Sequence, residues 1–301
     1  MIGLEVDRLV DRRAGFSFGQ VRIGDAIRRA AASFTFSSTP LLDARVLMKH
    51  VLSTDDATLI MRELEFLDEA PGEAFARVVE RRTSREPIAY IVGEKEFWGR
   101  PFYCEAPVLC PRPDTETLLI QAKEILHDRP PQRILDLGTG TGALLLSALG
   151  IWPDAYGIGI DRNPSATALA EKNANRLGFQ VRARFLTRHW TDYSDEERGS
   201  FDLIFCNPPY VKNGAALEAS ITKYEDPNAL YGGDDGLDAY REVIPIAANL
   251  LSEDGMLILE LGSGQADDVN AVLKQIAPDA HSTIKLDIAG IPRALAVTHL
   301  A

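Results

Sequence analysis

The stretch Arg133-Ile134-Leu135-Asp136-Leu137-Gly138-Thr139-Gly140-Thr141-Gly142 decides the fold. Its apolar first half predicts a buried strand, and its alternate glycines predict a tight turn that leads into a helix. Outward from this stretch, from about residue 113 to the C-terminus, strand-like and helical segments alternate. This alternation predicts a mainly parallel sheet with helices on both faces.

Seven strands are expected in this part of the chain. They are predicted at 133–136, 156–160, 180–186, 201–206, 256–260, 281–288 and 293–299. Helices are predicted at 114–127, 141–150, 164–177, 237–251 and 265–276. Only residues 289–292 join the last two strands, so these strands should pair as an antiparallel hairpin.

The chain before residue 113 has a different pattern. Apolar residues at helical spacing predict helices over 21–32, 40–52, 57–64 and 72–82. Residues 86–110 hold three aromatic, β-prone pieces, which are Ile88–Ile91, Phe97–Trp98 and Pro101–Tyr103. Glycines separate these pieces, so we expect a β-hairpin that links two domains.

The composition is that of an ordinary soluble protein, with 46% hydrophobic and 25% charged residues. The sequence has no apolar run long enough for a membrane span and no secretory signal pattern at its start. Three scattered cysteines are too few for a disulfide framework or a metal site, so a reducing cytoplasm is expected. Residues 91–301 hold 19 Lys+Arg against 30 Asp+Glu. This acidic part would repel a phosphate backbone, which disfavours nucleic acid as a substrate.

The glycine loop, residues 138–142, predicts a small-molecule site, because glycines let a backbone approach a ligand closely. Asp161 ends the next strand, where a carboxylate can accept hydrogen bonds from two ribose hydroxyls. Asp136 adds negative charge, which suits a sulfonium ligand better than a pyrophosphate. The loop resembles the G-x-G-x-G motif of class I S-adenosylmethionine-dependent methyltransferases. Trp190 follows the 180–186 strand and could either stack on an adenine or pack as a core or lid residue.

The strand at 201–206 ends in Asn207-Pro208-Pro209-Tyr210, a stiff and extended exit, because each proline fixes its own φ and restricts the residue before it. In methyltransferases this pattern marks enzymes that methylate planar nitrogens, namely adenine N6, cytosine N4 or a glutamine amide. The lone pair of such a nitrogen is delocalised and therefore poorly nucleophilic. The Asn207 oxygen and the Pro208 carbonyl can accept its two N–H bonds, and Tyr210 can pack on the flat group. Rate acceleration would then come from positioning and electrostatics, without a strong general base.

Further motifs extend the resemblance along the chain. They are residues 85–93, 96–99, 109–116, 224–227 and 230–238, in order around the two motifs above. Together they resemble the HemK family, the release-factor glutamine N5-methyltransferases, over roughly residues 20–300.

This resemblance implies a helical N-terminal docking domain (1–85), a β-hairpin linker (86–112) and a Rossmann-like, seven-stranded methyltransferase domain (113–301). It implies S-adenosyl-L-methionine as cofactor, S-adenosyl-L-homocysteine as product and no metal. The partners would be class I peptide chain release factors, methylated at the glutamine of their Gly-Gly-Gln motif in the cytoplasm, with neither nucleic acid nor membrane involved. The implied cofactor-binding residues are Gly138, Thr139, Gly140, Thr141, Gly142, Asp161, Trp190 and Asn207. Asn207, Pro208, Pro209 and Tyr210 would hold the glutamine, with Asn207, Pro208 and Tyr210 as the catalytic residues.

Two positions depart from the family pattern. Asp114 stands where the family usually has glutamate, and Arg188-His189 stand where an acidic residue after glycine is common. The second change bears on adenine recognition, and neither touches the methyl-transfer geometry. Three alternatives remain: a ribosomal-protein glutamine N5-methyltransferase, a nucleic-acid adenine N6-methyltransferase, and a non-enzymatic cofactor-binding protein.

Overall fold

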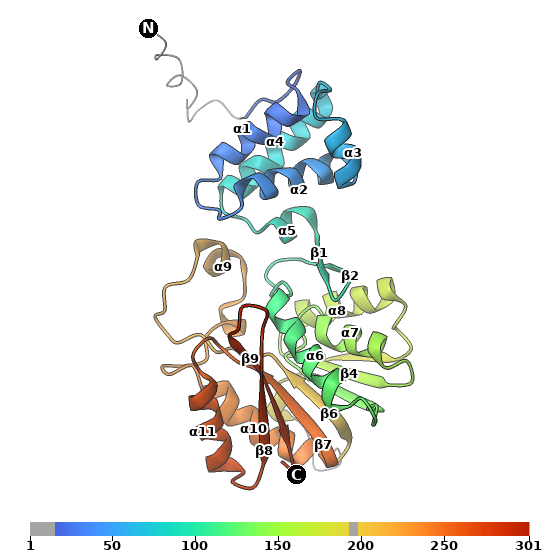
Figure 1. The fold of residues 1–301 in the computed structure, drawn as a ribbon, viewed down its shortest axis with the longest axis vertical. Coiled ribbons are helices and arrows are strands. Elements are labelled where there is room, and N and C mark those ends of the chain that lie inside the picture. The colour runs from blue at the N-terminus through green and yellow to red at the C-terminus, as the bar shows by residue number, and fades with distance from the viewer. Residues whose placement is uncertain (1–15, 193–197, 301) are drawn as a thin grey trace. The chain divides into compact units, whose positions relative to one another are not determined.

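The computed structural model describes residues 16–192 and 198–300 (Figure 1). The chain divides after Val92 into two compact units, each with its own hydrophobic core. The first unit is helical, and the second holds both β-sheets.

The first unit contains helices α1 (Ile23–Ser33), α2 (Pro40–Leu52), α3 (Asp56–Met61), α4 (Glu69–Thr83) and α5 (Ile88–Val92). Each of the first four lies where the apolar spacing predicts a helix. Ile23, Ala26, Ile27 and Ala30 face inward from α1, as a period of 3.6 residues requires. They share one core with side chains from α2 and α4, including Leu47 and Phe75.

Helix α5 corrects the prediction that Ile88–Ile91 is a β-prone piece. The amide N–H groups of Tyr90 and Ile91 both donate to the Pro87 carbonyl, which begins the helix. Ile91 is buried in the core of the first unit, with Ile88 and Val92 packed beside it. Burial of these side chains on one helical face outweighs their β-propensity, which depends strongly on context.

The predicted hairpin is present but shorter, with strands β1 (Glu94–Phe97) and β2 (Arg100–Tyr103). Trp98 and Gly99 form its two-residue turn, and both have positive φ, as the right-handed twist of a hairpin favours. Phe97 and Phe102 are buried in the core of the second unit, so the hairpin belongs to that unit.

The main sheet of the second unit has seven strands in the order β5-β4-β3-β6-β7-β9-β8. They are β3 (Arg133–Leu137), β4 (Tyr156–Asp161), β5 (Ala183–Thr187), β6 (Phe201–Cys206), β7 (Leu251–Glu260), β8 (His281–Leu286) and β9 (Pro292–Thr298). The helices are α6 (Glu116–Ile125), α7 (Ala143–Ile151), α8 (Pro164–Leu177), α9 (Ala219–Tyr224), α10 (Asp238–Leu250) and α11 (Ala266–Ile276). Short 3₁₀ helices of this unit include η1 (Pro113–Thr115), η2 (Trp190–Asp192) and η4 (Pro227–Ala229). This fold is the predicted Rossmann-like methyltransferase domain, and the predicted antiparallel β8–β9 hairpin is confirmed.

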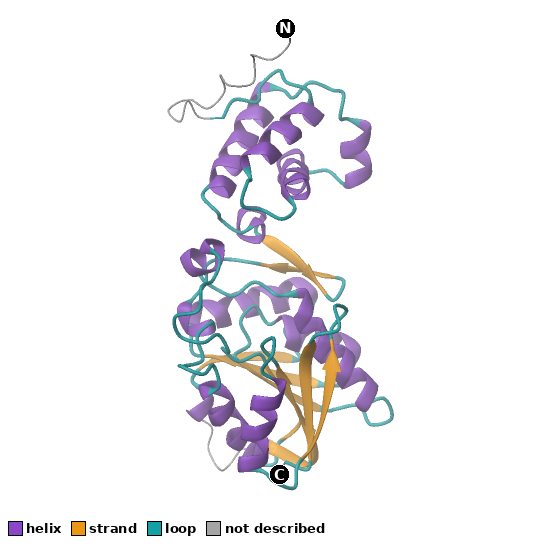
Figure 2. Ribbon diagram, turned by 60° about the vertical axis from the view of Figure 1, so that its left-hand side comes forward, coloured by secondary structure: helices purple, strands orange, loops and turns teal. Residues whose placement is uncertain are grey.

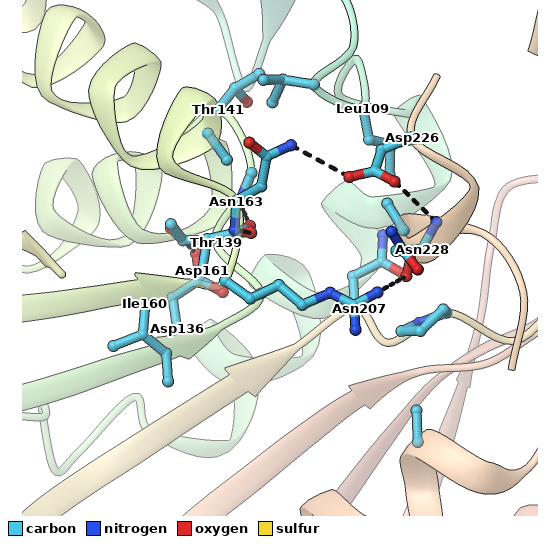
Figure 3. A pocket seen from close by; sticks show the side chains of 18 of the residues that line it. Leu109, Asp136, Thr139, Thr141, Ile160, Asp161, Asn163, Asn207, Asp226 and Asn228 are labelled. Atoms are coloured by element: carbon cyan, nitrogen blue, oxygen red, sulfur yellow. Dashed lines mark hydrogen bonds between the residues drawn. The ribbon is translucent and has the colours of Figure 1, made fainter. Parts of the chain in front are cut away.

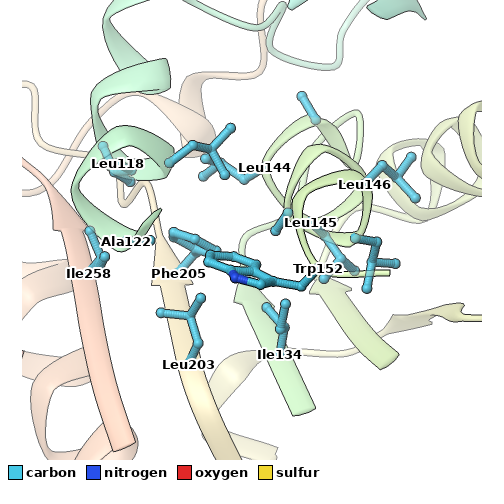
Figure 4. Close-up of a cluster of buried hydrophobic side chains, with 14 of the residues drawn as sticks. Leu118, Ala122, Ile134, Leu144, Leu145, Leu146, Trp152, Leu203, Phe205 and Ile258 are labelled. Carbon is cyan, nitrogen blue, oxygen red and sulfur yellow. The ribbon is translucent and has the colours of Figure 1, made fainter. Parts of the chain in front are cut away.

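Helices cover both faces of the sheet (Figure 2). Alternate residues of each strand point to opposite faces, so Leu203 and Phe205 join one core and Ile204 and Cys206 the other. The first core receives side chains from α6, α7 and α8, and Figure 4 shows Phe205 within it. The second core receives side chains from α10 and α11. Among residues 16–192 and 198–300, no helix is both long and apolar enough to cross a membrane.

The strand order reverses at β3, which pairs in parallel with β4 on one side and β6 on the other. Ligands of open α/β sheets bind at such a switch point, outside the carboxyl ends of the strands. The glycine loop follows β3 and Asn207 follows β6, so sheet topology brings the two sequence motifs to adjacent strand ends.

Candidate active site

A pocket of about 280 Å³ lies at these strand ends. Figure 3 shows Asp136, Asp161 and Asn207 around it, from the ends of β3, β4 and β6. A second wall comes from Asp226 and Asn228, near the C-terminal end of the long connection between β6 and α10. All of the lining residues belong to the second unit.

The glycine loop lines the pocket with Gly138, Thr139, Gly140 and Thr141. Gly138 and Gly140 have φ of 77° and 53°, a left-handed conformation that glycine adopts without a steric cost. The N–H groups of Gly138 and Thr139 both donate to the Ile160 carbonyl, which fastens the loop to β4. The position of a Cβ on Gly140 has no atom within 4 Å, so the bare backbone of the loop is open to a ligand.

Asp136 lies one residue before the end of β3, and its carboxylate is only 1% exposed. Thr139 donates its hydroxyl to Asp136 Oδ2 at 2.7 Å. Burial raises the pKa of Asp136 to about 7, and the nearby Asp161 carboxylate adds to the increase. Negative charge at this position is therefore costly for the protein alone and would be favoured by a positively charged ligand.

Asp161 lies across from the loop, at the end of β4. Its Oδ2 accepts the Gly140 N–H at 3.0 Å, and its Oδ1 accepts the Asn163 N–H at 2.9 Å. Burial raises the pKa of Asp161, although these two hydrogen bonds oppose the increase. Each carboxylate oxygen has a second lone pair, so Asp161 can hold the loop and still accept two hydroxyl groups.

Gly142 is the one residue of the glycine loop that does not line the pocket. Its φ is 78°, and a Cβ there would lie 3.1 Å from Ala170 Cβ and 3.3 Å from the Phe185 ring. Close packing of α7 against α8 and β5 accounts for this glycine without a ligand.

Trp190 lines the pocket from η2, beside Gly138. Its indole Nε1 donates to Glu242 Oε2 of α10 at 2.9 Å, and Glu242 also lines the pocket. Glu242 is 52 residues away from its partner and belongs to none of the sequence motifs, so it is not among the predicted site residues. The bond fixes the edge of the indole and places an acidic oxygen next to it.

Asn207 and Pro209 of the proline exit line the pocket, whereas the Pro208 ring is buried and Tyr210 points elsewhere. The exit is held from outside by the segment 230–236, because Val211 N–H donates to the Leu230 carbonyl and the backbone at Gly232 packs against Pro209. A side chain at Gly232 would clash with the Pro209 carbonyl. This contact explains Gly232 of the 230–238 motif.

A buried carboxylate, Glu260, lies beneath the exit at the end of β7. Its Oε2 accepts the Thr115 hydroxyl at 2.6 Å, and its Oε1 accepts the Tyr210 hydroxyl at 3.1 Å. Asn207 Nδ2 lies 3.5 Å from Thr115 Oγ1. Burial raises the pKa of Glu260 to about 7, against the opposing effects of Thr115, Tyr210 and Arg293.

Glu260 and Thr115 are not among the site residues predicted from the sequence, although the sequence holds a signal for each. Glu260 is an acidic residue that ends an apolar strand, as Asp161 does. Thr115 lies inside the 109–116 motif.

The rim of the pocket is joined by polar contacts between distant segments. Arg112 Nη2 contacts both Glu225 oxygens, at 2.6 and 2.8 Å, and the Glu225 side chain is only 1% exposed. Asn163 Nδ2 donates to Asp226 Oδ2 at 3.2 Å (Figure 3). No cluster of three His, Cys, Asp or Glu side chains that could hold a metal ion occurs in the described parts of the chain.

Known proteins resemble this chain over most of its length. Residues 25–93 match a family described as the PrmC N-terminal domain, and residues 129–242 match one described as a methyltransferase domain. The release factor glutamine methyltransferase of Bradyrhizobium diazoefficiens is 42% identical over 84% of this chain and 86% of its own length. That of Rhodospirillum rubrum is 39% identical over 85% of this chain and 78% of its own length.

Among solved structures, the hMettl16 catalytic domain in complex with the MAT2A 3′UTR hairpin 6 matches 75% of this chain and 81% of its own. Its TM-score is 0.54 and its sequence identity 15%, so this likeness concerns the fold alone.

Proposed function

The chain belongs to the release factor glutamine methyltransferase family, and from this premise we propose its substrate, cofactor and site residues. The enzyme methylates the side-chain nitrogen N5 of the glutamine in the Gly-Gly-Gln motif of class I peptide chain release factors. The cofactor is S-adenosyl-L-methionine, which supplies an electrophilic methyl group when bound. One observation carries the proposal: the open glycine loop lines the same pocket as Asn207 and Pro209 of the proline exit.

The residues of this pocket fit the cofactor. Gly138 and Gly140 present bare backbone, and Asp161 retains a free lone pair on each oxygen for ribose hydroxyls. Trp190 offers an aromatic face for a purine, and its indole is held by Glu242. The buried charge of Asp136 favours a cation over a neutral molecule.

The proline exit would hold the glutamine amide. Asn207 Oδ1 and the Pro208 carbonyl would accept its two N–H bonds, and a geometry that aims the nitrogen lone pair at the sulfonium methyl would favour pyramidalisation of the nitrogen. The scale of the amide conjugation that this opposes is the rotation barrier of about 18–20 kcal/mol. The protein lowers the cost by fixed position and by acceptors that are already oriented. Directly after methyl transfer the nitrogen would be cationic and very acidic, so it would lose its extra proton to water without a strong general base and leave the neutral N-methyl amide.

The helical unit would bind the release factor. Ile60, Met61, Leu64 and Phe66, from α3 and the turn after it, are 57%, 75%, 75% and 65% exposed. Neighbouring exposed apolar side chains of this kind are typical of protein interaction surfaces. The double variant Met61→Asp/Leu64→Asp should raise KM for the release factor and leave the affinity for S-adenosylhomocysteine unchanged.

A labelling experiment tests the substrate. The protein is incubated with radiolabelled S-adenosylmethionine and, separately, a class I release factor, its Gly-Gly-Gln Gln→Ala variant, and DNA. We expect label on the natural release factor alone. Label on DNA, or undiminished label on the variant, would overturn the proposal.

Asn207→Ala tests the site. The variant should lose most of its turnover and keep its affinity for S-adenosylhomocysteine, as measured by calorimetry. If affinity collapses together with turnover, Asn207 is a cofactor-binding residue first and the assignment is wrong.

We also propose a cytoplasmic location, where the buried thiols Cys104, Cys110 and Cys206 stay reduced.

A further inference from the structure

Glu260 is a buried ionisable group whose role the proposed reaction leaves open. It is 1% exposed, and a carboxylate removed from water costs free energy unless its oxygens are well partnered. Both oxygens are used, one on Thr115 and one on Tyr210. Thr115 lines the pocket, and Tyr210 belongs to the proline exit that lines it, so Glu260 acts on the site without touching a ligand itself.

The polarity of these contacts is fixed by proton counting. Above its pKa of about 7, Glu260 is an ionised carboxylate that can only accept, so Thr115 gives its single hydroxyl proton to Glu260 Oε2 at 2.6 Å. Thr115 Oγ1 then has only lone pairs left for its other neighbour. That neighbour is the Asn207 carboxamide, whose Nδ2 lies 3.5 Å away.

The carboxamide of Asn207 has two orientations, which exchange its oxygen and its NH2 group. Only the orientation with NH2 toward Thr115 gives an attractive contact, because a carbonyl oxygen facing the lone pairs of Thr115 would be repelled. The same orientation turns Oδ1 away from Thr115 and frees it as an acceptor. In the reverse orientation the NH2 group of Asn207 would face the NH2 group of the substrate amide. Two donors would then oppose each other, and no hydrogen bond could form.

We propose that Glu260 is a positioning residue that acts through Thr115 to keep the Asn207 carboxamide oxygen available to the substrate amide. This inference rests on the proposed function and deepens it, because it explains how a pocket made for an amide distinguishes its own acceptor oxygen from its NH2 group. It also gives the 109–116 motif a role beside the proline exit. Thr115 links Glu260 at the end of β7 to Asn207 after β6, and the direction of its hydroxyl proton sets the orientation of the Asn207 carboxamide.

Thr115→Val is the main test, since valine keeps the shape of threonine and removes the acceptor. With a class I release factor as substrate, we expect kcat to fall about tenfold or more. KM and the dissociation constant of S-adenosylhomocysteine should stay within about twofold. Thr115→Ser retains the hydroxyl and should restore most of kcat.

Tyr240→Phe is the matched control. The Tyr240 hydroxyl also donates to Glu260, at 2.8 Å, but to its backbone carbonyl, and it does not touch the chain from Glu260 to Asn207. Both variants remove one buried hydrogen bond that contacts the same residue. A purely structural role of the network predicts similar kinetics for both variants, whereas the proposal predicts a loss of kcat in Thr115→Val alone.

A second measurement does not depend on turnover. In protein labelled with ¹⁵N-asparagine, the side-chain NH2 signals of Asn207 are assigned by their absence in Asn207→Ala. They should shift in Thr115→Val and remain in place in Thr115→Ser and Tyr240→Phe. If wild-type protein fails to methylate the release factor, the proposed function fails and the NMR comparison still decides this inference. Equal kcat in Thr115→Val and Tyr240→Phe, or unshifted Asn207 signals in Thr115→Val, overturns it.

Discussion

Asp136 lines the proposed active site, yet its replacement by asparagine should make the protein more stable than wild type at pH 8. The gain in stability over wild type should be much smaller at pH 4. Asp136 is 1% exposed near the end of β3, and burial is the main cause of its raised pKa. Asparagine has nearly the same shape and can still accept the Thr139 hydroxyl, but it carries no charge at any pH.

The magnitude follows from the two pKa values. The pKa of Asp136 rises from 3.8 to about 7 in the folded protein, a difference of about 3, and each pKa unit corresponds to about 1.36 kcal/mol. Between these pH values the folded state binds more protons than the unfolded state, so stability falls as pH rises through this window. Above pH 7 the folded protein carries a penalty of up to about 4 kcal/mol, which the variant lacks. Glu260 changes stability in the same direction, but it does so in both proteins and cancels in the comparison.

Urea unfolding followed by tryptophan fluorescence measures the effect, because Trp98, Trp152 and Trp190 all belong to the second unit. The free energy of unfolding of Asp136→Asn minus that of wild type should rise by about 4 kcal/mol from pH 4 to pH 8. The exposed Asp279→Asn serves as a control and should show little change. A difference that stays flat or falls over this range would refute the reasoning.

Three further predictions concern stability and are measured by urea unfolding. Gly142→Ala should cost about 2–3 kcal/mol, because its φ of 78° disfavours alanine and the new Cβ would lie 3.1 Å from Ala170 Cβ. A cost below about 0.5 kcal/mol would contradict the packing role. Arg112→Ala should cost about 3 kcal/mol, because the buried Glu225 carboxylate loses its partner, and adding Glu225→Gln should recover most of that loss. No recovery in the double variant would exclude an unpaired charge as the cause. Phe205→Ala should cost about 3–5 kcal/mol, since the ring is fully buried between α6, α7 and the sheet, and an unchanged urea midpoint would contradict its place in the core.

Strong local signals explain where the predicted elements agree with the fold. Strand β6 and helix α2 have the predicted bounds, 201–206 and 40–52. The mostly apolar run of β6 ends at Cys206, directly before Asn207 and the two prolines, and a proline at the first helical position begins α2. Helix α9 was not predicted, because it has only six residues and none of them is buried, so it leaves no periodic pattern. Residues 88–91 were predicted wrongly, because their partners lie in α2 and α4 and are invisible to local propensity.

The residues of the candidate site also fall into two groups, those that local sequence signals predict and those that only the tertiary structure identifies. Asp161 and Asn207 could be selected from sequence because each is a polar residue directly after a buried strand, and Asp136 stands near the end of another. Gly142 belongs to the same motif as Gly140, yet only the tertiary structure separates a glycine that opens to the pocket from one that packs against α8. Sequence spacing cannot make that distinction, because both residues have positive φ.

The sequence by itself determined the sheet-forming pattern, the two motifs and the family, because strands, glycine turns and proline exits are encoded by neighbouring residues. Only the tertiary structure decided which side chains act on one another at the site. Thr115 and Glu260 are 145 residues apart, and Trp190 and Glu242 are 52 apart. They meet because the fold brings η1 to the end of β7 and α10 to η2, beside the carboxyl ends of the strands. The polarity of Asn207 depends on that arrangement, since one buried carboxylate directs one hydroxyl proton.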